Sequence, residues 1–135
     1  MLKTDGINFK NGESFTLGPF TITPYLVDHS AYDSYALLVE AEGKRIFYSG
    51  DFRSHGRKGK LIERLILSPP VDIDILLMEG SSLGRLDMEE SFPSEHDMEE
   101  EFTGAFRENT GPVLVHTSSQ NIDRIVTIYR ACVKI

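Results

Sequence analysis

Apolar and polar residues in the first half of the chain form short runs that end at turn residues. The runs expected to be strands cover residues 15–17, 20–27, 35–39 and 45–48. Gly18 and Pro19 separate the first two runs, and a link that contains Gly43 separates the next two. Short runs bounded by glycine or proline are typical of strands joined in hairpins. The first half therefore predicts antiparallel β-structure.

In the second half, apolar positions recur every three to four residues, which predicts helices. One helix is expected over residues 60–67. A second begins at Ser94, with Asp97 three residues later as in a capping box. A third is capped by Ser119 or Asn121. The apolar sides are expected to be Met98, Phe102, Ala105 and Phe106 in the second helix, and Ile122, Ile125, Val126, Tyr129, Cys132 and Val133 in the third.

Two apolar runs, residues 73–78 apart from Asp74 and residues 113–115, suit strands that are covered on both faces. Strands dominate the beginning of the chain, and strands and helices alternate after it. This order predicts an α/β fold in which helices cover a mixed sheet.

Composition fits one globular domain. The chain has 135 residues, of which 40% are hydrophobic and 26% charged, and no apolar run approaches the ~20 residues of a membrane span. The first residues contain no long apolar stretch, so no secretory signal is expected. Cys132 is the single cysteine, which excludes an internal disulfide and favours the cytoplasm. On the apolar side of the third helix, Cys132 is expected to be a core residue.

The net charge of -7 is concentrated in one segment. Residues 87–101 contain eight acids and no Lys or Arg, which leaves 13 acids against 14 bases elsewhere. Such a run predicts a solvated helix face. A basic cluster follows Asp51 and could attract phosphate. It consists of Arg53, Arg57, Lys58, Lys60 and Arg64.

Three polar positions follow predicted strands: His29 after Asp28, Asp51 after Gly50, and Glu79 before Gly80. Loops at strand ends on one edge of an α/β sheet commonly bind ligands. Imidazole and carboxylate groups suit zinc, which can activate a bound water. Spacing alone leaves plainer interpretations open, because a lone histidine is often a surface residue and a Gly-Asp pair is often a turn.

The surrounding residues resemble a known family. Residues 28–39 read DHSAYDSYALLV and residues 45–53 read RIFYSGDFR. This pattern resembles the metallo-β-lactamase superfamily, in which an isolated His precedes a hairpin whose second strand ends in Gly-Asp. Residues 74–81, DILLMEGS, look like the acidic motif that opens the β-CASP branch, which contains RNA-processing nucleases such as ribonuclease J. Residues 113–124, VLVHTSSQNIDR, are similar to the start of the β-CASP insertion.

The resemblance implies a role for each matching residue. His29 corresponds to a metal ligand, and Asp51 to the carboxylate that bridges two zinc ions. Glu79 corresponds to the acidic group that supports the site and orients a ligand histidine. The implied activity is zinc-dependent hydrolysis of RNA phosphodiester bonds.

Contacts with the substrate phosphates are expected from residues near these motifs. The candidates are His55, Arg57, Ser118, Ser119, Gln120 and Asn121. Hydroxyls and N–H groups at a helix N-terminus suit phosphate, although helix capping explains residues 118–121 equally well. His116, after a predicted strand, is expected to be structural.

The sequence also departs from the family. The main His-x-His-x-Asp-His ligand run is missing. The chain therefore resembles the middle of a longer enzyme, with residues 1–90 as the C-terminal half of the metallo-β-lactamase-like domain and 91–135 as the beginning of the β-CASP segment. We expect the isolated chain to be inactive and to bind zinc poorly.

Two alternatives stay open. The chain could be a non-catalytic remnant or interaction module that self-associates through an exposed sheet edge. It could also be a small-substrate hydrolase of the same fold.

Overall fold

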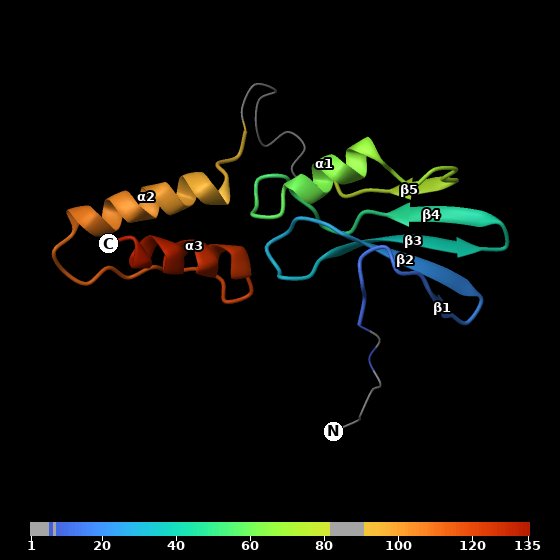
Figure 1. The fold of residues 1–135 in the computed structure, drawn as a ribbon, viewed down its shortest axis with the longest axis horizontal. Helices are drawn as coiled ribbons and strands as arrows, with labels where there is room; N and C mark the ends of the chain where they lie inside the picture. The colour runs from blue at the N-terminus through green and yellow to red at the C-terminus, as the bar shows by residue number, and fades with distance from the viewer. Residues whose placement is uncertain (1–5, 7, 82–90) are drawn as a thin grey trace.

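The computed structural model describes residues 6, 8–81 and 91–135. Its strands form one sheet with the order β1-β2-β3-β4-β5 (Figure 1). They are β1 (Phe15–Leu17), β2 (Phe20–Leu26), β3 (Tyr35–Ala41), β4 (Lys44–Tyr48) and β5 (Ile75–Leu77). Neighbours are antiparallel from β1 to β4, and β5 is parallel to β4. The fold is thus α/β with a mixed sheet, as the sequence predicts.

The hairpin between β3 and β4 closes through a two-residue turn at Glu42 and Gly43. Their φ angles are 50° and 72°, and Ala41 pairs with Lys44 on either side of the turn. Positive φ at both central positions matches the right-handed twist of the flanking strands. The turn fixes the register of the two strands and brings the chain to Ser49 at the end of β4.

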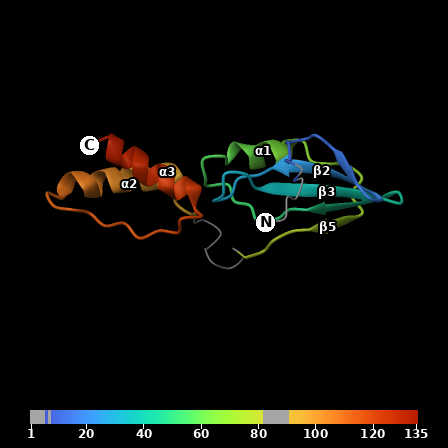
Figure 2. The same ribbon diagram turned by 90° about the horizontal axis from the view of Figure 1, so that it is seen from below.

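One helix covers one side of the sheet (Figure 2). It is α1 (Lys60–Leu67), the residues that the apolar spacing predicts. Ile62 of α1 is buried, and Leu65 packs against the same core. The strands and the loop after β2 contribute Val27, Ala36, Leu38 and Phe47 to this core.

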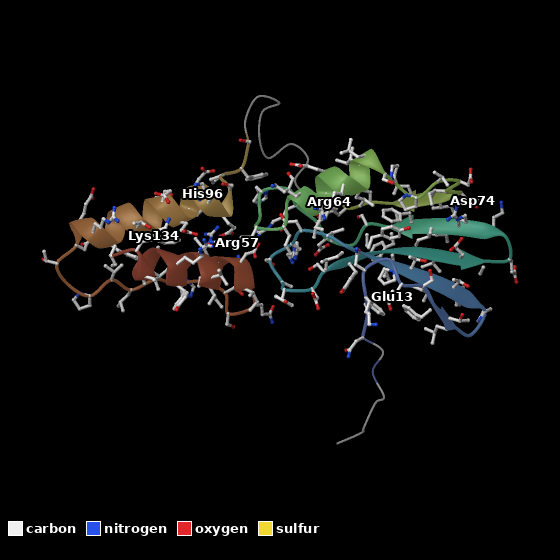
Figure 3. The ribbon with its side chains drawn as sticks, in the orientation of Figure 1. Glu13, Arg57, Arg64, Asp74, His96 and Lys134 are labelled. Carbon is white, nitrogen blue, oxygen red and sulfur yellow. The ribbon has the colours of Figure 1, made fainter. Side chains whose placement is uncertain are left out.

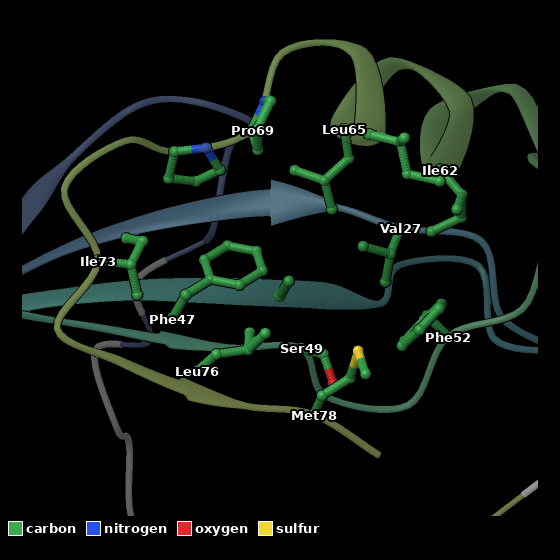
Figure 4. Close-up of a pocket in the computed structure, with 13 residues that line it drawn as sticks. Val27, Phe47, Ser49, Phe52, Ile62, Leu65, Pro69, Ile73, Leu76 and Met78 are labelled. Atoms are coloured by element: carbon green, nitrogen blue, oxygen red, sulfur yellow. The ribbon is translucent and has the colours of Figure 1, made fainter. Parts of the chain in front are cut away.

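An apolar cavity of about 380 Å³ lies between α1 and the sheet (Figure 4). Phe47 and Leu76 line it from the sheet, Leu65 lines it from α1, and Ile73 closes one side. α1 and the strands thus border an apolar pocket that is partly open to solvent, since Leu76 is 57% exposed.

The other two helices form a pair beyond the edge where β2, β4 and β5 end (Figure 1). They are α2 (Glu95–Glu108) and α3 (Ile122–Val133). The Glu95 carboxylate accepts the Thr127 hydroxyl at 2.6 Å, and Glu99, one turn later, lies 2.8 Å from Lys134. The two helices therefore run in the same direction.

The helix starts follow the predicted capping chemistry. The Ser94 hydroxyl accepts the Asp97 N–H, and the Asp97 carboxylate accepts the Ser94 N–H, so the capping box is confirmed. The Asn121 side chain accepts the Arg124 N–H at 3.0 Å and caps α3.

Two expectations of buried strands are wrong. Residues 75–77 do form β5, but Ile75 is 49% exposed and Leu77 50%, because β5 pairs on one side only, with β4. Residues 113–115 form no strand, and Leu114 is 95% exposed. A strand needs a neighbour for its backbone hydrogen bonds, and the described residues place none beside this run.

The predicted apolar side of α3 is also largely uncovered, whereas that of α2 is partly covered, since Met98 and Phe102 are half-buried and Phe106 is buried. Tyr129 and Val133 are each 68% exposed, and Cys132 is exposed rather than a core residue. The buried residues are Glu95, Glu99, Thr103 and Phe106 in α2, and Asp123, Thr127 and Ala131 in α3. The pair therefore packs through polar groups together with Phe106 and Ala131, and most of the apolar residues predicted to lie on the buried side of α3 are exposed.

The predicted boundary between residues 90 and 91 borders segment 82–90, which lies outside the described residues. On either side of that segment, the sheet with α1 and the α2–α3 pair form two groups of elements (Figure 1). Within the described parts of the chain, no helix has the length and apolarity needed to cross a membrane.

Candidate functional site

The sheet topology brings the three predicted polar positions to one edge. β2 and β4 are both antiparallel to β3, and β5 is parallel to β4. β2, β4 and β5 therefore point in the same direction. His29, Asp51 and Glu79 follow the carboxyl ends of these three strands, so the expectation that they share an edge is confirmed. Their roles as ligands stay predictions.

Glu79 ties the ends of β4 and β5 together. Its Oε1 accepts the Phe52 N–H at 2.8 Å, next to Asp51. Its Oε2 accepts the Ser81 hydroxyl at 2.7 Å, and its own N–H donates to the Ser49 Oγ at 3.1 Å. The Glu79 side chain thus holds the loop that carries Asp51.

These hydrogen bonds determine the ionisation of Glu79. The Ser81 hydroxyl and then the Phe52 N–H lower the pKa of the carboxyl, and the electrostatic effect of the nearby His29 lowers it further against the effect of burial. Each donor favours the charged form. Glu79 is therefore a carboxylate near neutral pH, suited to accepting hydrogen bonds rather than donating a proton.

Gly50 positions Asp51 through the close approach of its backbone to β3. Its φ is +59°, and a Cβ atom at this position would lie 3.0 Å from the Tyr35 carbonyl oxygen. A side chain here would meet both backbone strain and crowding. Asp51 itself is exposed, so its carboxylate is open to a ligand.

His29 lies across the edge from Asp51 and is half-buried. Its Nδ1 is 3.2 Å from the Ser30 Oγ. Contacts of this kind to one ring nitrogen often fix the tautomer of a metal-binding histidine. Among the residues that the structure describes, no three His, Cys, Asp or Glu side chains are grouped so as to hold a metal. His29 and Asp51 are thus at most two ligands of an incomplete set.

Asp28, beside His29, has a role that the sequence does not predict. Its side chain is fully buried and accepts the N–H groups of Gly56 at 2.7 Å and Lys58 at 3.2 Å. Its carbonyl oxygen accepts the Arg53 N–H at 2.8 Å. Asp28 therefore fixes the loop after Asp51 to the end of β2. In the sequence, the one sign of this role is that the acid Asp28 directly precedes the candidate ligand His29.

Two members of the basic cluster, Arg53 and Arg57, are engaged within the protein, whereas Lys60 and Arg64 are exposed on α1. The Arg53 Nη2 atom lies 2.5 Å from Asp123 of α3, and the Arg57 Nη2 atom donates to Glu99 and to the Thr127 hydroxyl, each at 2.8 Å. Figure 3 shows Arg57 reaching the α2–α3 pair. The guanidinium of Arg57, predicted to contact substrate, is thus engaged within the protein.

Within the described residues, the acidic run is solvated only in part: Asp97, Glu100 and Glu101 are exposed, whereas its other two acids are buried. Glu95 and Glu99 are each 2% exposed. Glu95 accepts Arg124 at 3.1 Å, and Glu99 is paired with Arg57 and Lys134. Hydrogen bonds from Lys134 and then Arg57 lower the pKa of Glu99 to about 2. Both acids are therefore charged, buried partners of bases; residues 87–90 of the run lie outside the described residues.

His55 lines a pocket of about 330 Å³ beside Glu79. Its ring lies 5.4 Å from the ring of Phe92. Burial and then the charge of Arg53 lower the pKa of His55, against smaller opposite effects of Asp28 and Glu95. The imidazole is therefore neutral near pH 7 and adjoins the predicted site.

Residues 118–121 form the turn that begins α3. The Ser118 Oγ accepts the Gln120 N–H at 3.3 Å, and Asn121 caps the helix. The Asp123 N–H donates to the Ser30 carbonyl at 3.3 Å, so this turn lies near the loop of His29. Capping thus occupies Asn121, and Ser119 and Gln120 are exposed; contacts of these residues with phosphate stay a prediction.

Comparisons with known proteins show the fold alone. No protein-family model and no curated protein matches the chain. A crystal structure of a protein of unknown function from Enterococcus faecalis V583 is similar to it, with a TM-score of 0.74 and 24% sequence identity. The similarity covers 94% of this chain and 31% of that one, so the chain spans about a third of the length of its structural neighbour.

Proposed function

We propose that this chain contributes His29 and Asp51 as two ligands to a zinc-dependent hydrolase of RNA phosphodiester bonds, and that it does not complete the site alone. The observation that carries the proposal is the meeting of His29, Asp51 and Glu79 at one edge of the sheet. The partial metallo-β-lactamase fold belongs to the same proposal. It is supported by the mixed sheet, the hairpin before Asp51 and the helix that covers one face.

The residues fit the chemistry of such a site only in part. A catalytic zinc has three protein ligands and an open position, at which it lowers the pKa of a bound water. His29 and Asp51 supply two ligands. In this proposal Glu79 acts as a positioning residue that holds the Asp51 loop through Phe52. We derive no catalytic step from an incomplete ligand set.

Three features support a phosphodiester over a small ester. The motif at residues 74–81 resembles the β-CASP branch, whose members act on RNA. The N-terminus of α3 lies near the His29 loop, where its N–H groups would favour an anionic ligand. The pocket beside Glu79 and His55 offers room for a nucleotide portion.

Zinc titration of the purified chain tests this proposal. We expect weak binding that is lost in His29→Ala and in Asp51→Ala and kept in His116→Ala, which changes an exposed histidine. An end-labelled RNA should remain intact. Zinc binding that is unaffected by both ligand variants would contradict the site, and stoichiometric zinc with turnover would contradict its incompleteness.

A further inference from the structure

We propose that two arginines of the loop after Asp51 fix the α2–α3 pair to the edge of the sheet, and that the pair is released when either arginine is lost. We call the two arginines and the acids that they contact the ionic clasp. It comprises Arg53, Arg57, Asp28, Glu95, Glu99 and Asp123. The proposal is independent of the proposed hydrolase function.

Apolar packing contributes little to the attachment of the helix pair. The core under α1 consists of residues from the strands, the neighbouring loops and α1, and it includes no residue of α2 or α3. Among the described elements, α2 and α3 pack closely against each other but not against a strand or α1. The rings of His55 and Phe92, 5.4 Å apart, make one contact between the loop and the residues before α2. Polar groups therefore supply most of the attachment.

Arg53 lies at the centre of the ionic clasp. Its Nη2 atom is 2.5 Å from Asp123 of α3, and its Nη1 atom is 3.6 Å from Glu95, the first residue of α2. Its Nε atom is 3.9 Å from the Asp28 carboxylate, just after β2. All three acids are buried, and the Arg53 side chain is 14% exposed. One cation thus joins the beginnings of both helices to the end of β2.

Arg57 makes the second connection, one helical turn further along the pair. Its Nη2 atom donates to Glu99 of α2 and to the Thr127 hydroxyl of α3, each at 2.8 Å (Figure 3). Glu99 is 2% exposed and Thr127 is fully buried. The backbone N–H of Arg57 also donates to Asp123 at 3.4 Å. The guanidinium of a loop residue therefore reaches the interface between the two helices.

Two backbone hydrogen bonds cross the same boundary. The Glu95 N–H donates to the His55 carbonyl at 3.0 Å, and the Asp123 N–H donates to the Ser30 carbonyl at 3.3 Å. Both donors lie in the first turn of a helix, where an N–H group has no acceptor within its own helix. The two N–H groups are therefore protected from water only while the pair is attached to the loops. Their exchange with solvent reports whether the ionic clasp is closed.

An attachment of this kind is sensitive to the loss of one charge. The desolvation of buried charges offsets much of their attraction, and removal of one partner leaves the others buried without compensation. The helices have contacts of their own that do not involve the loop. Arg124 donates to Glu95 at 3.1 Å, and Lys134 lies 2.8 Å from Glu99. Loss of a loop arginine should therefore detach the pair without unfolding its helices.

Amide hydrogen exchange, followed by NMR on the full chain, tests the ionic clasp. Arg53→Met should raise the exchange rates of the Glu95 and Asp123 N–H groups by about 10- to 100-fold, the factor that corresponds to loss of one hydrogen bond to a charged group. The Thr127 N–H, inside α3, should keep its wild-type rate.

Arg57→Met should act in the same direction as the first substitution, because it removes the second connection. The matched control is Arg130→Met. Arg130 also pairs with Glu99, at 3.3 Å, but from within the helix pair. Its loss should leave the exchange of the Glu95 and Asp123 N–H groups at the wild-type rate.

A distance measurement follows the pair as a whole. Cys132 is the single cysteine of the chain and is exposed on α3. Glu63→Cys, at an exposed position of α1, supplies the second site for a pair of spin labels. We expect one narrow distance distribution with the wild-type clasp and a broader one after Arg53→Met. If circular dichroism shows that this variant loses helix, Asp123→Asn replaces it and opens the clasp from the other side.

Three outcomes would overturn the proposal. The first is wild-type exchange of the Glu95 N–H in both loop variants. The second is an equal rise in Arg130→Met, which would show that any charge in the pair has the same effect. The third is an equal rise at Thr127, which would show that the helices unfold rather than detach.

Discussion

The Asp28 carboxylate lies directly against the α-carbon of Gly56, and its Oδ2 accepts the Gly56 N–H at 2.7 Å. A Cβ atom at position 56 would lie 2.3 Å from the Asp28 Oδ1 and 2.8 Å from the Arg53 Nε. The contact joins the end of β2, which carries His29, to the loop that follows Asp51. The absence of a side chain at residue 56 therefore allows the two candidate ligand loops to be fixed to each other.

Gly56→Ala should destabilise the protein through this contact. The added methyl must displace a fully buried carboxylate, and overpacking of this kind costs about 1–3 kcal/mol. Urea unfolding followed by circular dichroism measures the change. Gly111→Ala is the matched control, because a Cβ there meets nothing within 4 Å, and its effect should stay within about 0.5 kcal/mol. Equal effects of the two substitutions would contradict the role of the Asp28 contact.

Removal of the Glu79 side chain should loosen the loop of Asp51. Glu79→Ala deletes the acceptors of the Phe52 N–H and the Ser81 hydroxyl, and loss of hydrogen bonds to a charged group costs about 1.5–3 kcal/mol. Amide hydrogen exchange should become faster at Phe52 in the variant. Ser81→Ala removes one of the two bonds and should leave exchange at Phe52 close to wild type. Unchanged exchange in Glu79→Ala would show that the loop is held by other contacts.

Local sequence rules predict much of the fold. The start and end of α1 follow from apolar spacing, and the capping box identifies Ser94 as the start of α2. The hairpins follow from turn residues such as Gly43. These features depend on residues a few positions apart, so the sequence contains all the information they require.

Burial in the second half could not be predicted in the same way. Glu99 looks solvated among its acidic neighbours, yet Arg57, 42 positions earlier, makes its burial favourable. Residues 113–115 have the composition of a strand, but a strand forms only beside a partner. The α3 stripe that includes Tyr129 has the apolar pattern of a buried side and nothing described to cover it. Whether each of these segments is buried depends on the part of the protein that packs against it.

The candidate site also has features that the local sequence predicts and features that it does not. The convergence of His29, Asp51 and Glu79 follows from the positions of strand ends, which the sequence predicts well. The function of Asp28 depends on Gly56 and Lys58, which lie 28 and 30 positions away. Nothing in the local sequence specifies that contact. The site's polar positions are thus predictable, whereas the contacts that hold them in place are not.

The lowered pKa of the buried Glu99 predicts how the stability of the fold depends on pH. Its pKa is lowered from 4.5 to about 2 in the folded chain by Lys134 and Arg57. A carboxyl with a depressed pKa in the folded state stabilises the protein above its unfolded pKa, and this contribution is lost as the pH falls towards the folded value. The urea concentration at the midpoint of unfolding should therefore decrease as the pH is lowered from about 4.5 to about 2.

Glu99→Gln should reduce that pH dependence, because the amide has no proton to gain in this range. The variant should also be less stable than wild type at pH 7, since Arg57 and Lys134 lose a charged partner. Glu101→Gln, at an exposed position of the same helix, serves as the control and should keep the wild-type slope. If Glu99→Gln and Glu101→Gln gave the same urea midpoints across the acid range, the Glu99 cluster would not be a source of acid lability.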